Sequence, residues 1–525
     1  MSRFIPFVVA VVLAVGGLAL SATVSPWWAV VAVVGLVLLG LAGFDIAQRR
    51  HSIWRNYPII GHLRWLLEGF RPELQQYFVE LDTVGAPFDH DTRALVYVRA
   101  KNKHEDQPFG TERDVYAEGH EWLDHSLAPK PAADEHRVRV GGPDCSQPYD
   151  MSLLNVSAMS FGSLSANAIR ALNRGAALGG FAHDTGEGGL TEYHLEGGGD
   201  LIWEIGTGYY GCRTLDGRFD PDVFATKVAI PAVKAVNVKL SQGAKPGLGG
   251  VMPAAKVTAE IAEIRGVPAG QRCVSPPAHS AFATPLELVT FIDDLRRLSG
   301  GKPVGFKLCV GRRVDFLGVC KAMLDTGIHP DFIVVDGSEG GTGAAPVEFT
   351  DHVGTPLTEG LIFVHNALVG AGLRNDIRVG ASGKIATGFS IVSRLAQGAD
   401  YTNAARTMMF ALGCIQAQRC HTNTCPVGVA TQDPRRTGGL VVSDKAARVH
   451  QYHRHTVASA NQLIASMGLS DPAELGPQLL NRRLDPQTIR SYDQLYQYLE
   501  PGELLVSPPA EWAADWIAAR PDRFG

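Results

Sequence analysis

Two long apolar runs stand near the start of the chain. Residues 4–23 are apolar almost without interruption, and after a short turn a second apolar run covers 27–44. Each run approaches the roughly 20 residues that an α-helix needs to cross the hydrocarbon core of a bilayer. Trp27 and Trp28 fall at the turn, where aromatic side chains favour the membrane interface. The pattern predicts a transmembrane hairpin over 1–48. It disfavours a signal peptide, since no small-residue cleavage site separates the two runs.

Basic residues flank this hairpin at both of its ends. Arg3 precedes the first run, and Arg49, Arg50 and Arg55 follow the second. Because Lys and Arg accumulate on the cytoplasmic side of membrane spans, both ends of the hairpin are expected to face the cytoplasm. The sequence thus predicts a multi-pass protein of the cell membrane whose remaining chain lies in the cytoplasm.

A polar connecting region, 49–150, follows and is expected to wrap on the main domain. Within it, 62–78 suggests one amphipathic helix near the membrane, with Arg64, Trp65 and Arg71 at the level of the lipid headgroups. The alternative, an ordinary helix packed against the main domain, stays open.

Short β-type runs alternate with helical runs from 151 to about 440. This alternation predicts a parallel sheet, and eight units over this length predict a closed (β/α)8 TIM barrel of the α/β class. An open doubly wound sheet is the rival fold. No G-x-G-x-x-G follows the first strand, so a nicotinamide-binding unit has no support. The tail, 441–525, is expected to be helical and then irregular. The predicted strands are 154–160, 180–185, 235–240, 271–275, 304–310, 332–336, 377–380 and 400–404.

Composition narrows the class of function. The 525 residues carry a formal net charge of −5, and no basic run or basic–aromatic stripe indicates nucleic-acid binding. Eight cysteines in so long a chain do not indicate a secreted disulfide framework. Five of them are scattered and are expected to be packing residues in a reducing compartment: Cys145, Cys212, Cys273, Cys309 and Cys320.

In a barrel, ligand-binding residues collect after the carboxyl ends of the strands. The sixth, seventh and eighth predicted strands are followed there by glycines and cations. Glycines let backbone N–H groups approach a phosphate, and barrels often bind a phosphate after strands seven and eight. One such loop alone is equally consistent with a tight turn, but three adjacent ones predict a phosphorylated ligand. The residues are Gly340, Gly341, Gly343, Gly383, Lys384, Ala405 and Arg406.

Lys307 lies inside an apolar strand pattern, GFKLCV, where an unpaired ammonium group is unfavourable to bury. The anionic edge of a reduced flavin would offset that burial. A neighbouring carboxylate, such as Glu187 or Asp336, is the alternative partner.

Four further polar residues lie at or after strand ends and remain for a substrate. Two lysines and a glutamine suit a dicarboxylate such as a 2-oxo acid, and a glutamate suits an ammonium ion or a protonated imine. These candidate catalytic residues are Glu187, Lys239, Gln242 and Lys245.

Three cysteines are grouped in 414–432 with the spacing C-x5-C-x4-C. Thiolates ligate iron, and a four-iron cluster needs a fourth cysteine, so a three-iron cluster or a cluster with one open iron is indicated. A Cys3His zinc site with His421, and plain packing, remain alternatives. A phosphate site beside an iron–sulfur candidate favours an FMN enzyme, because the cluster passes single electrons and the flavin delivers a hydride. The three residues are Cys414, Cys420 and Cys425.

Motifs over about 150–435 resemble, in order, the synthase domain of glutamate synthase. The resemblance implies an FMN-containing barrel with a three-iron four-sulfur (3Fe–4S) cluster that reduces 2-iminoglutarate, formed from 2-oxoglutarate and ammonia, to L-glutamate. The motifs are MSFGSLS (159–165), TGEGG (185–189), KLSQGAKPGLGG (239–250), SPPAH (275–279), GSEGGTGAAP (337–346) and CxxxxxCHTNTCPVGVATQ (414–432).

The resemblance also implies roles for single residues. Cys414, Cys420 and Cys425 correspond to the cluster ligands. The residues implied to contact the substrate are Glu187, Lys239, Gln242 and Lys245. The residues implied to contact the flavin are Met159, Ser160, Lys307, Lys384, Arg406 and the strand-end glycines.

The sequence departs from the large glutamate synthases in its accessory parts. Neither a cysteine-nucleophile glutaminase domain nor a nicotinamide domain is recognisable. Ammonia is therefore expected from solution or from a separate glutaminase subunit, and electrons from ferredoxin, a partner flavoprotein or a membrane donor. The membrane hairpin resembles the shorter, membrane-tethered members of the FMN-binding glutamate synthase family.

Two other functions remain open. The first is a membrane-linked flavin dehydrogenase of another amino or 2-oxo acid that passes electrons to a quinone or a partner protein. The second is a membrane-anchored scaffold with a vestigial flavin site, which the intact glycine loops and the complete cysteine triplet disfavour.

Overall fold

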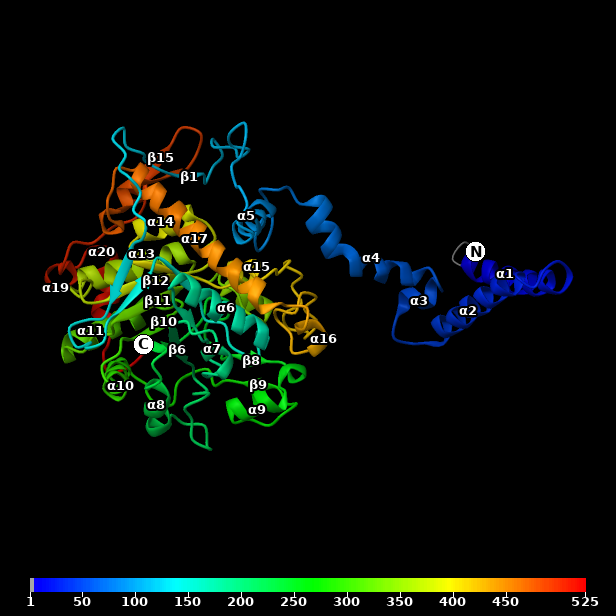
Figure 1. Ribbon diagram of the computed structural model, residues 1–525, viewed down its shortest axis with the longest axis horizontal. Coiled ribbons are helices and arrows are strands. Elements are labelled where there is room, and N and C mark those ends of the chain that lie inside the picture. The colour runs from blue at the N-terminus through cyan, green and yellow to red at the C-terminus, as the bar shows by residue number, and fades with distance from the viewer. Residues whose placement is uncertain (1–3) are drawn as a thin grey trace. The chain divides into compact units, whose positions relative to one another are not determined.

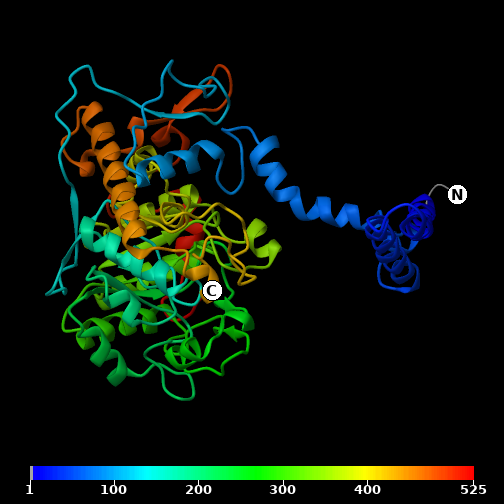
Figure 2. The same cartoon turned by 45° about the vertical axis from the view of Figure 1, so that its right-hand side comes forward.

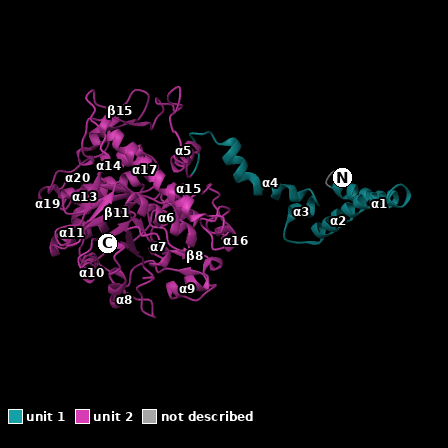
Figure 3. Cartoon of the chain, in the orientation of Figure 1, with its two compact units in different colours: residues 1–86 teal, residues 87–525 magenta. Residues whose placement is uncertain are grey.

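The computed structural model describes residues 4–525, so Arg3, used above to orient the hairpin, lies outside the described residues. The chain divides into two compact units, residues 1–86 and residues 87–525 (Figure 3).

The first unit is built on two apolar helices, α1 (Ile5–Thr23) and α2 (Trp28–Ala47). Small residues allow the two backbones to approach closely, since a Cβ atom added to Gly17 would lie 2.5 Å from the backbone nitrogen of Ala32. Contacts of this kind are typical of membrane helices, which associate through close packing. Few side chains of either helix are buried, and both helices are long and apolar enough to cross a membrane.

A buried acid ties this helical pair to the segment that follows. Asp45, near the end of α2, is fully buried, accepts a hydrogen bond from the backbone N–H of Ile59 at 2.9 Å, and lies 2.8 Å from Nε2 of His62. The amphipathic segment expected over 62–78 is helical, and its apolar residues Leu63, Leu66, Leu67 and Phe70 are exposed. The elements are α3 (Ser52–Asn56), α4 (Gly61–Leu74) and the π-helical turn η2 (Gln75–Val79).

The second unit holds a closed barrel of eight parallel strands, so the predicted (β/α)8 fold is confirmed (Figure 1). Each strand pairs with its successor along the chain, and the ring closes between the last strand and the first. The strands are β4 (Leu154–Val156), β5 (His183–Asp184), β6 (Leu201–Ile205), β7 (Val233–Lys239), β10 (Val304–Leu308), β11 (Phe332–Asp336), β12 (Arg378–Ser382) and β13 (Tyr401–Ala404).

The barrel differs from the prediction in one strand. The third strand is β6, which the sequence pattern does not predict, whereas the strand predicted over 271–275 lies outside the barrel. There, β9 (Cys273–Val274) pairs with β8 (Val251–Met252) in a small antiparallel hairpin. All five residues of β6, LIWEI, are buried. No alternation of polar and apolar positions therefore marks it, as is usual for strands of a parallel sheet. Lys239 consequently ends the fourth strand rather than the third.

Helices cover the outside of the barrel (Figures 1 and 2). Side-chain caps begin several of them: Ser165, Thr284 and Thr387 each accept a hydrogen bond from a backbone N–H of the first turn. The helices between β4 and the tail are α6 (Ala166–Gly179), α7 (Glu192–Leu195), α8 (Pro221–Val228), α9 (Ala259–Arg265), α10 (Pro285–Leu298), α11 (Arg313–Thr326), α12 (Val347–His352), α13 (Leu357–Gly370), α14 (Gly388–Ala396), α15 (Arg406–Ala411) and α16 (Pro434–Thr437).

The expected helical start of the tail is α17 (Val442–Ser466), which packs against α6, α14 and α5 (His90–Ala100). A three-stranded sheet joins the connecting region to the tail, because β1 (Glu121–Leu123) pairs with β14 (Leu480–Arg483). The remaining elements are β2 (Arg137–Val140), β3 (Tyr149–Ser152), η3 (Ala254–Lys256), η4 (Pro472–Glu474), η5 (Pro477–Leu479), β15 (Ile489–Ser491), α18 (Tyr492–Leu495), α19 (Glu503–Val506) and α20 (Ala510–Ala518).

Candidate active site

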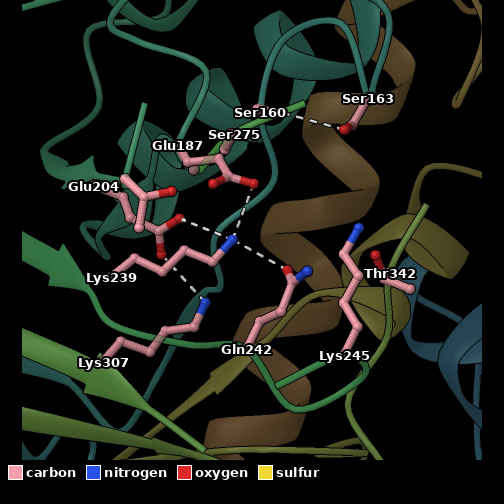
Figure 4. Close-up of polar contacts among 12 residues, drawn as sticks. Ser160, Ser163, Glu187, Glu204, Lys239, Gln242, Lys245, Ser275, Lys307 and Thr342 are labelled. Carbon is pink, nitrogen blue, oxygen red and sulfur yellow. Dashed lines mark hydrogen bonds and ion pairs between the residues drawn. The ribbon is translucent and has the colours of Figure 1, made fainter. Parts of the chain in front are cut away.

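Polar side chains meet at the carboxyl end of the barrel strands (Figure 4). Lys239 is the last residue of β7, and its Nζ lies 3.1 Å from Oε1 of Glu187 and 3.1 Å from Oε1 of Gln242. Glu187 comes from the loop after β5 and Gln242 from the loop after β7. Three of the four residues predicted to face a substrate therefore converge on one point.

Lys245 is close to this group, but its amine points elsewhere (Figure 4). Its Nζ donates a hydrogen bond to the carbonyl oxygen of Ala344, in the loop after β11, at 2.7 Å. Burial lowers the pKa of Lys245 to about 8, although the charge of Glu187 acts in the opposite direction. The loops after β7 and β11 are in contact here, since a Cβ atom on Gly243 would overlap the carbonyl group of Gly337.

Two glycines make room for Glu187, because a Cβ atom on Gly206 or Gly250 would overlap its side chain. Burial acts to raise the pKa of Glu187, but the charge and hydrogen bond of Lys239 outweigh it, and the pKa lies below its ordinary value. The Glu187 side chain is therefore a carboxylate in the described structure, able to accept hydrogen bonds from a cationic or N–H-bearing group.

Glu204, on β6, is a site residue that the sequence analysis missed. It is almost fully buried, with Oε2 at 3.2 Å from Nζ of Lys307 and Oε1 at 4.0 Å from Nζ of Lys239. Burial acts to lower the pKa of Lys307, but the charges of Glu204 and other acids raise it above its ordinary value. Lys307 thus has a carboxylate partner, and that partner is neither of the two acids considered from the sequence. The sequence signal for this residue is a single glutamate inside the otherwise apolar run LIWEI.

A second buried acid, Asp184, ends β5. Its carboxylate accepts hydrogen bonds from the backbone N–H of Gly186 at 2.9 Å and from Nδ2 of Asn237 at 3.1 Å. Burial, reinforced by the charge of Glu204, raises the pKa of Asp184 to about 7. The interior of the barrel therefore holds one acid that changes charge near neutral pH.

The glycine loops after β11, β12 and β13 lie around two cations. A Cβ atom on Gly341 would contact the side chain of Arg406, whose Nη2 donates a hydrogen bond to the carbonyl oxygen of Glu339 at 2.6 Å. Lys384, with φ of 50° in the left-handed region, follows Gly383, and both burial and Arg406 lower its pKa. In the described residues neither cation forms a salt bridge. This arrangement fits a phosphate group.

The loop after β4 carries Met159 and Ser160 and packs against the loop after β5, since a Cβ atom on Gly186 would lie 2.6 Å from the backbone nitrogen of Ser160. Ser160 Oγ donates to Ser163 Oγ at 3.2 Å. The structure therefore places Met159 and Ser160 beside the loop that carries Glu187. Their contact with a flavin stays a prediction.

The three grouped cysteines lie after α15, in a loop without regular secondary structure. Burial raises the pKa of Cys414 to about 12, and the charges of Cys420 and Cys425 act in the same direction. The three thiols therefore lie close enough to influence one another electrostatically. Across the described residues, no set of three thiols gathers within 4.8 Å. A single tetrahedral zinc ion would hold its sulfur ligands roughly 3.8 Å apart. His421 is exposed. The donor set, three free thiols in one loop, suits an iron–sulfur cluster, and these thiols are not gathered as the ligands of a single zinc ion would be.

Known proteins place the chain in a family. Residues 134–470, more than half of the chain, match the model for the conserved region in glutamate synthase. The glutamate synthase large subunit-like protein YerD of Bacillus subtilis is 37% identical over 511 residues, which cover 88% of this chain and 97% of YerD. An archaeal-type NADPH glutamate synthase of Thermotoga neapolitana is 33% identical over 60% of this chain, which spans 59% of that protein's length.

Among solved structures, a double mutant of flavocytochrome b2 with pyruvate bound matches over 78% of this chain and 88% of its own, with a TM-score of 0.41 and 15% identity. The extent of the match to the conserved region and to YerD shows that the chain belongs to the glutamate synthase family and is an oxidoreductase.

Proposed function

We propose that the chain is an FMN- and iron–sulfur-dependent enzyme that reduces 2-iminoglutarate, formed from 2-oxoglutarate and ammonia, to L-glutamate. The observation that carries the proposal is the convergence of Glu187, Lys239 and Gln242 at the carboxyl end of the barrel. Membership of the glutamate synthase family supports the choice of substrate.

The side chains of this group suit the two ends of such a substrate. Gln242 Oε1 accepts a hydrogen bond from Lys239, so its Nε2 group keeps both N–H donors for a carboxylate. Lys239 supplies a positive charge beside them. Glu187, held as a carboxylate, would accept hydrogen bonds from the nitrogen of the imine and stabilise its protonated form.

The cofactors would be held by separate parts of the site. The glycine loops with Lys384 and Arg406 would bind the phosphate of FMN, Met159, Ser160 and Lys307 would contact its ring, and the three grouped cysteines would ligate a 3Fe–4S cluster. When bound, the flavin would supply a hydride and the cluster would supply single electrons. The buried Glu204, with one carboxylate oxygen near each ammonium group, would offset the repulsion between Lys307 and Lys239 and hold both in place.

The two apolar helices would anchor the enzyme in the cell membrane with its catalytic unit in the cytoplasm. Support comes from their length, their composition and the small residues between them. Electrons would come from ferredoxin, a partner flavoprotein or a membrane donor. Ammonia would come from solution or from a separate glutaminase subunit.

The test uses purified full-length protein whose flavin has been reduced under anaerobic conditions. Reoxidation, followed by flavin absorbance, should require 2-oxoglutarate and ammonium together, and L-glutamate should accumulate. Reoxidation that ignores either substrate would refute the proposal. Bleaching of the oxidised flavin by an amino acid, followed by quinone reduction, would instead support the membrane-linked dehydrogenase. The presence of the hairpin favours that second candidate.

A further inference from the structure

Lys256 is a buried lysine that the proposed reaction does not use. It ends η3, between the β8 strand and α9, and its side chain is only 2% exposed. Its Nζ donates a hydrogen bond to the carbonyl oxygen of Ser163 at 2.8 Å. Over the part of the chain that the structure describes, it forms no salt bridge with a carboxylate. A buried ammonium group without an anionic partner is unfavourable, and a nearby anion would stabilise it.

Three segments meet around Lys256. In the cysteine loop, Asn423 Nδ2 donates to the carbonyl oxygen of Ala255, the residue before Lys256, at 3.0 Å. Farther along that loop, Gln432 Nε2 donates to the carbonyl oxygen of Leu164 at 2.8 Å. Lys256 itself reaches Ser163. The lysine thus lies where the cysteine loop, η3 and the loop after β4 are hydrogen-bonded to one another.

The part of the cysteine loop nearest to Lys256 is the stretch between Cys420 and Cys425, because Asn423 is hydrogen-bonded to Ala255. Burial acts to lower the pKa of Lys256, and the charges of Cys420 and Cys425 oppose that effect. In the described structure, the loop that carries these cysteines therefore lies against the segment of the buried lysine, and no carboxylate pairs with it.

We propose that Lys256 is the counter-charge of the iron–sulfur cluster and sets its reduction potential. The inference rests on the proposed function, because it requires the cluster. Thiolate ligands are negative, and reduction adds one more negative charge. A nearby buried cation stabilises the reduced form more than the oxidised form, and it does so strongly because a protein interior screens charge weakly. Lys256 therefore raises the midpoint potential. Its hydrogen bond to Ser163 fixes that charge against the loop after β4, where Met159 and Ser160 are predicted to contact the flavin.

The test is a dithionite titration of the purified full-length protein, with redox mediators. Electron paramagnetic resonance follows the signal of the oxidised three-iron cluster. Lys256→Met removes the charge with little change in length, whereas Lys256→Arg keeps it. Lys302→Met is a matched control, because Lys302 is also buried and donates to the carbonyl oxygens of Val228 at 2.5 Å and Ile230 at 3.4 Å. It precedes β10, at the opposite end of the strands from the cysteine loop.

The midpoint potential of Lys256→Met should be more negative than that of the wild type, while Lys256→Arg and Lys302→Met stay close to it. Loss of the cluster in Lys256→Met alone, with native circular dichroism, would also show that the charge is required. An unchanged potential in Lys256→Met, or loss of the cluster in both Lys256 variants, would overturn the inference. Absence of the signal in the wild type would instead refute the iron–sulfur assignment in the proposed function.

Discussion

Nζ of Lys307 and Oε2 of Glu204 lie 3.2 Å apart inside the barrel, across the strand that separates β10 from β6. Both side chains are almost fully buried. Removal of one member of such a pair leaves the charge of the other uncompensated, whereas removal of both leaves neither of these two charges. Glu204→Gln and Lys307→Met should each lower the free energy of unfolding by roughly 3–5 kcal/mol.

The double variant, Glu204→Gln with Lys307→Met, tests whether the two charges stabilise each other. Its loss of stability, measured by urea unfolding, should be clearly smaller than the sum of the two single losses. Additive losses would mean that the two side chains do not stabilise each other.

Lys239→Met should weaken the binding of 2-oxoglutarate. A hydrogen bond to a charged group contributes about 1.5–3 kcal/mol, so KM should rise roughly tenfold to a hundredfold in steady-state assays. The control is Lys234→Met, on the same strand, where a half-exposed lysine lies 3.5 Å from Asp200. Equal effects of the two substitutions would exclude a specific role for Lys239.

Asp184 should make stability fall as the pH rises. Its pKa is about 7 in the folded protein against an ordinary 3.8. Between these values the folded state keeps a proton that the unfolded chain has released, so unfolding becomes easier with rising pH. Asp184→Asn should flatten the dependence of the urea midpoint on pH between about 4 and 7. Asn237 can adapt by rotating its amide, because its Oδ1 has no partner in the described structure. A slope identical to that of the wild type would contradict the assignment.

Cys425→Ser should abolish the signal of the three-iron cluster, because serine offers no thiolate. Iron content per chain should fall in parallel. The matched substitution is Cys145→Ser, at a half-buried cysteine outside the grouped three, which should keep both signal and iron. If the wild-type protein contains zinc in place of iron, the assignment of an iron–sulfur cluster is wrong.

The apolar helices should hold the full chain in membranes through an alkaline carbonate wash, since α1 and α2 are long enough to span. A variant that begins at Pro87 keeps the whole second unit and should remain in the supernatant. Sedimentation of that variant with membranes would place the anchor elsewhere.

The sequence predicts the barrel because helical and β-type runs alternate, and seven of its strands carry that signal. It misplaces one strand because β6 is uniformly buried and reads like any short apolar segment. Glu204 is missed with that strand. The convergence of Glu187, Lys239 and Gln242 follows from their places after the strands, which any parallel barrel brings to one end.

Other parts of the site depend on distance in space rather than on sequence pattern. Lys256 lies in a short turn about 90 residues from Ser163 and about 160 from Cys420. Nothing local in the sequence distinguishes it from a surface lysine. Only the folding of the η3 segment against the cysteine loop reveals that Lys256 is buried beside that loop.

The hydrogen bonds of Gln432 and Asn423 tie the cysteine loop to the loop after β4 and to the η3 segment. Gln432 holds the carbonyl groups of Gly162 and Leu164, and Asn423 holds that of Ala255. A displacement of the cysteine loop would therefore also displace the loop after β4, or break these hydrogen bonds. A protein that docks beside the exposed His421 would contact a loop that is hydrogen-bonded to Gly162 and Leu164, a few residues from Ser160.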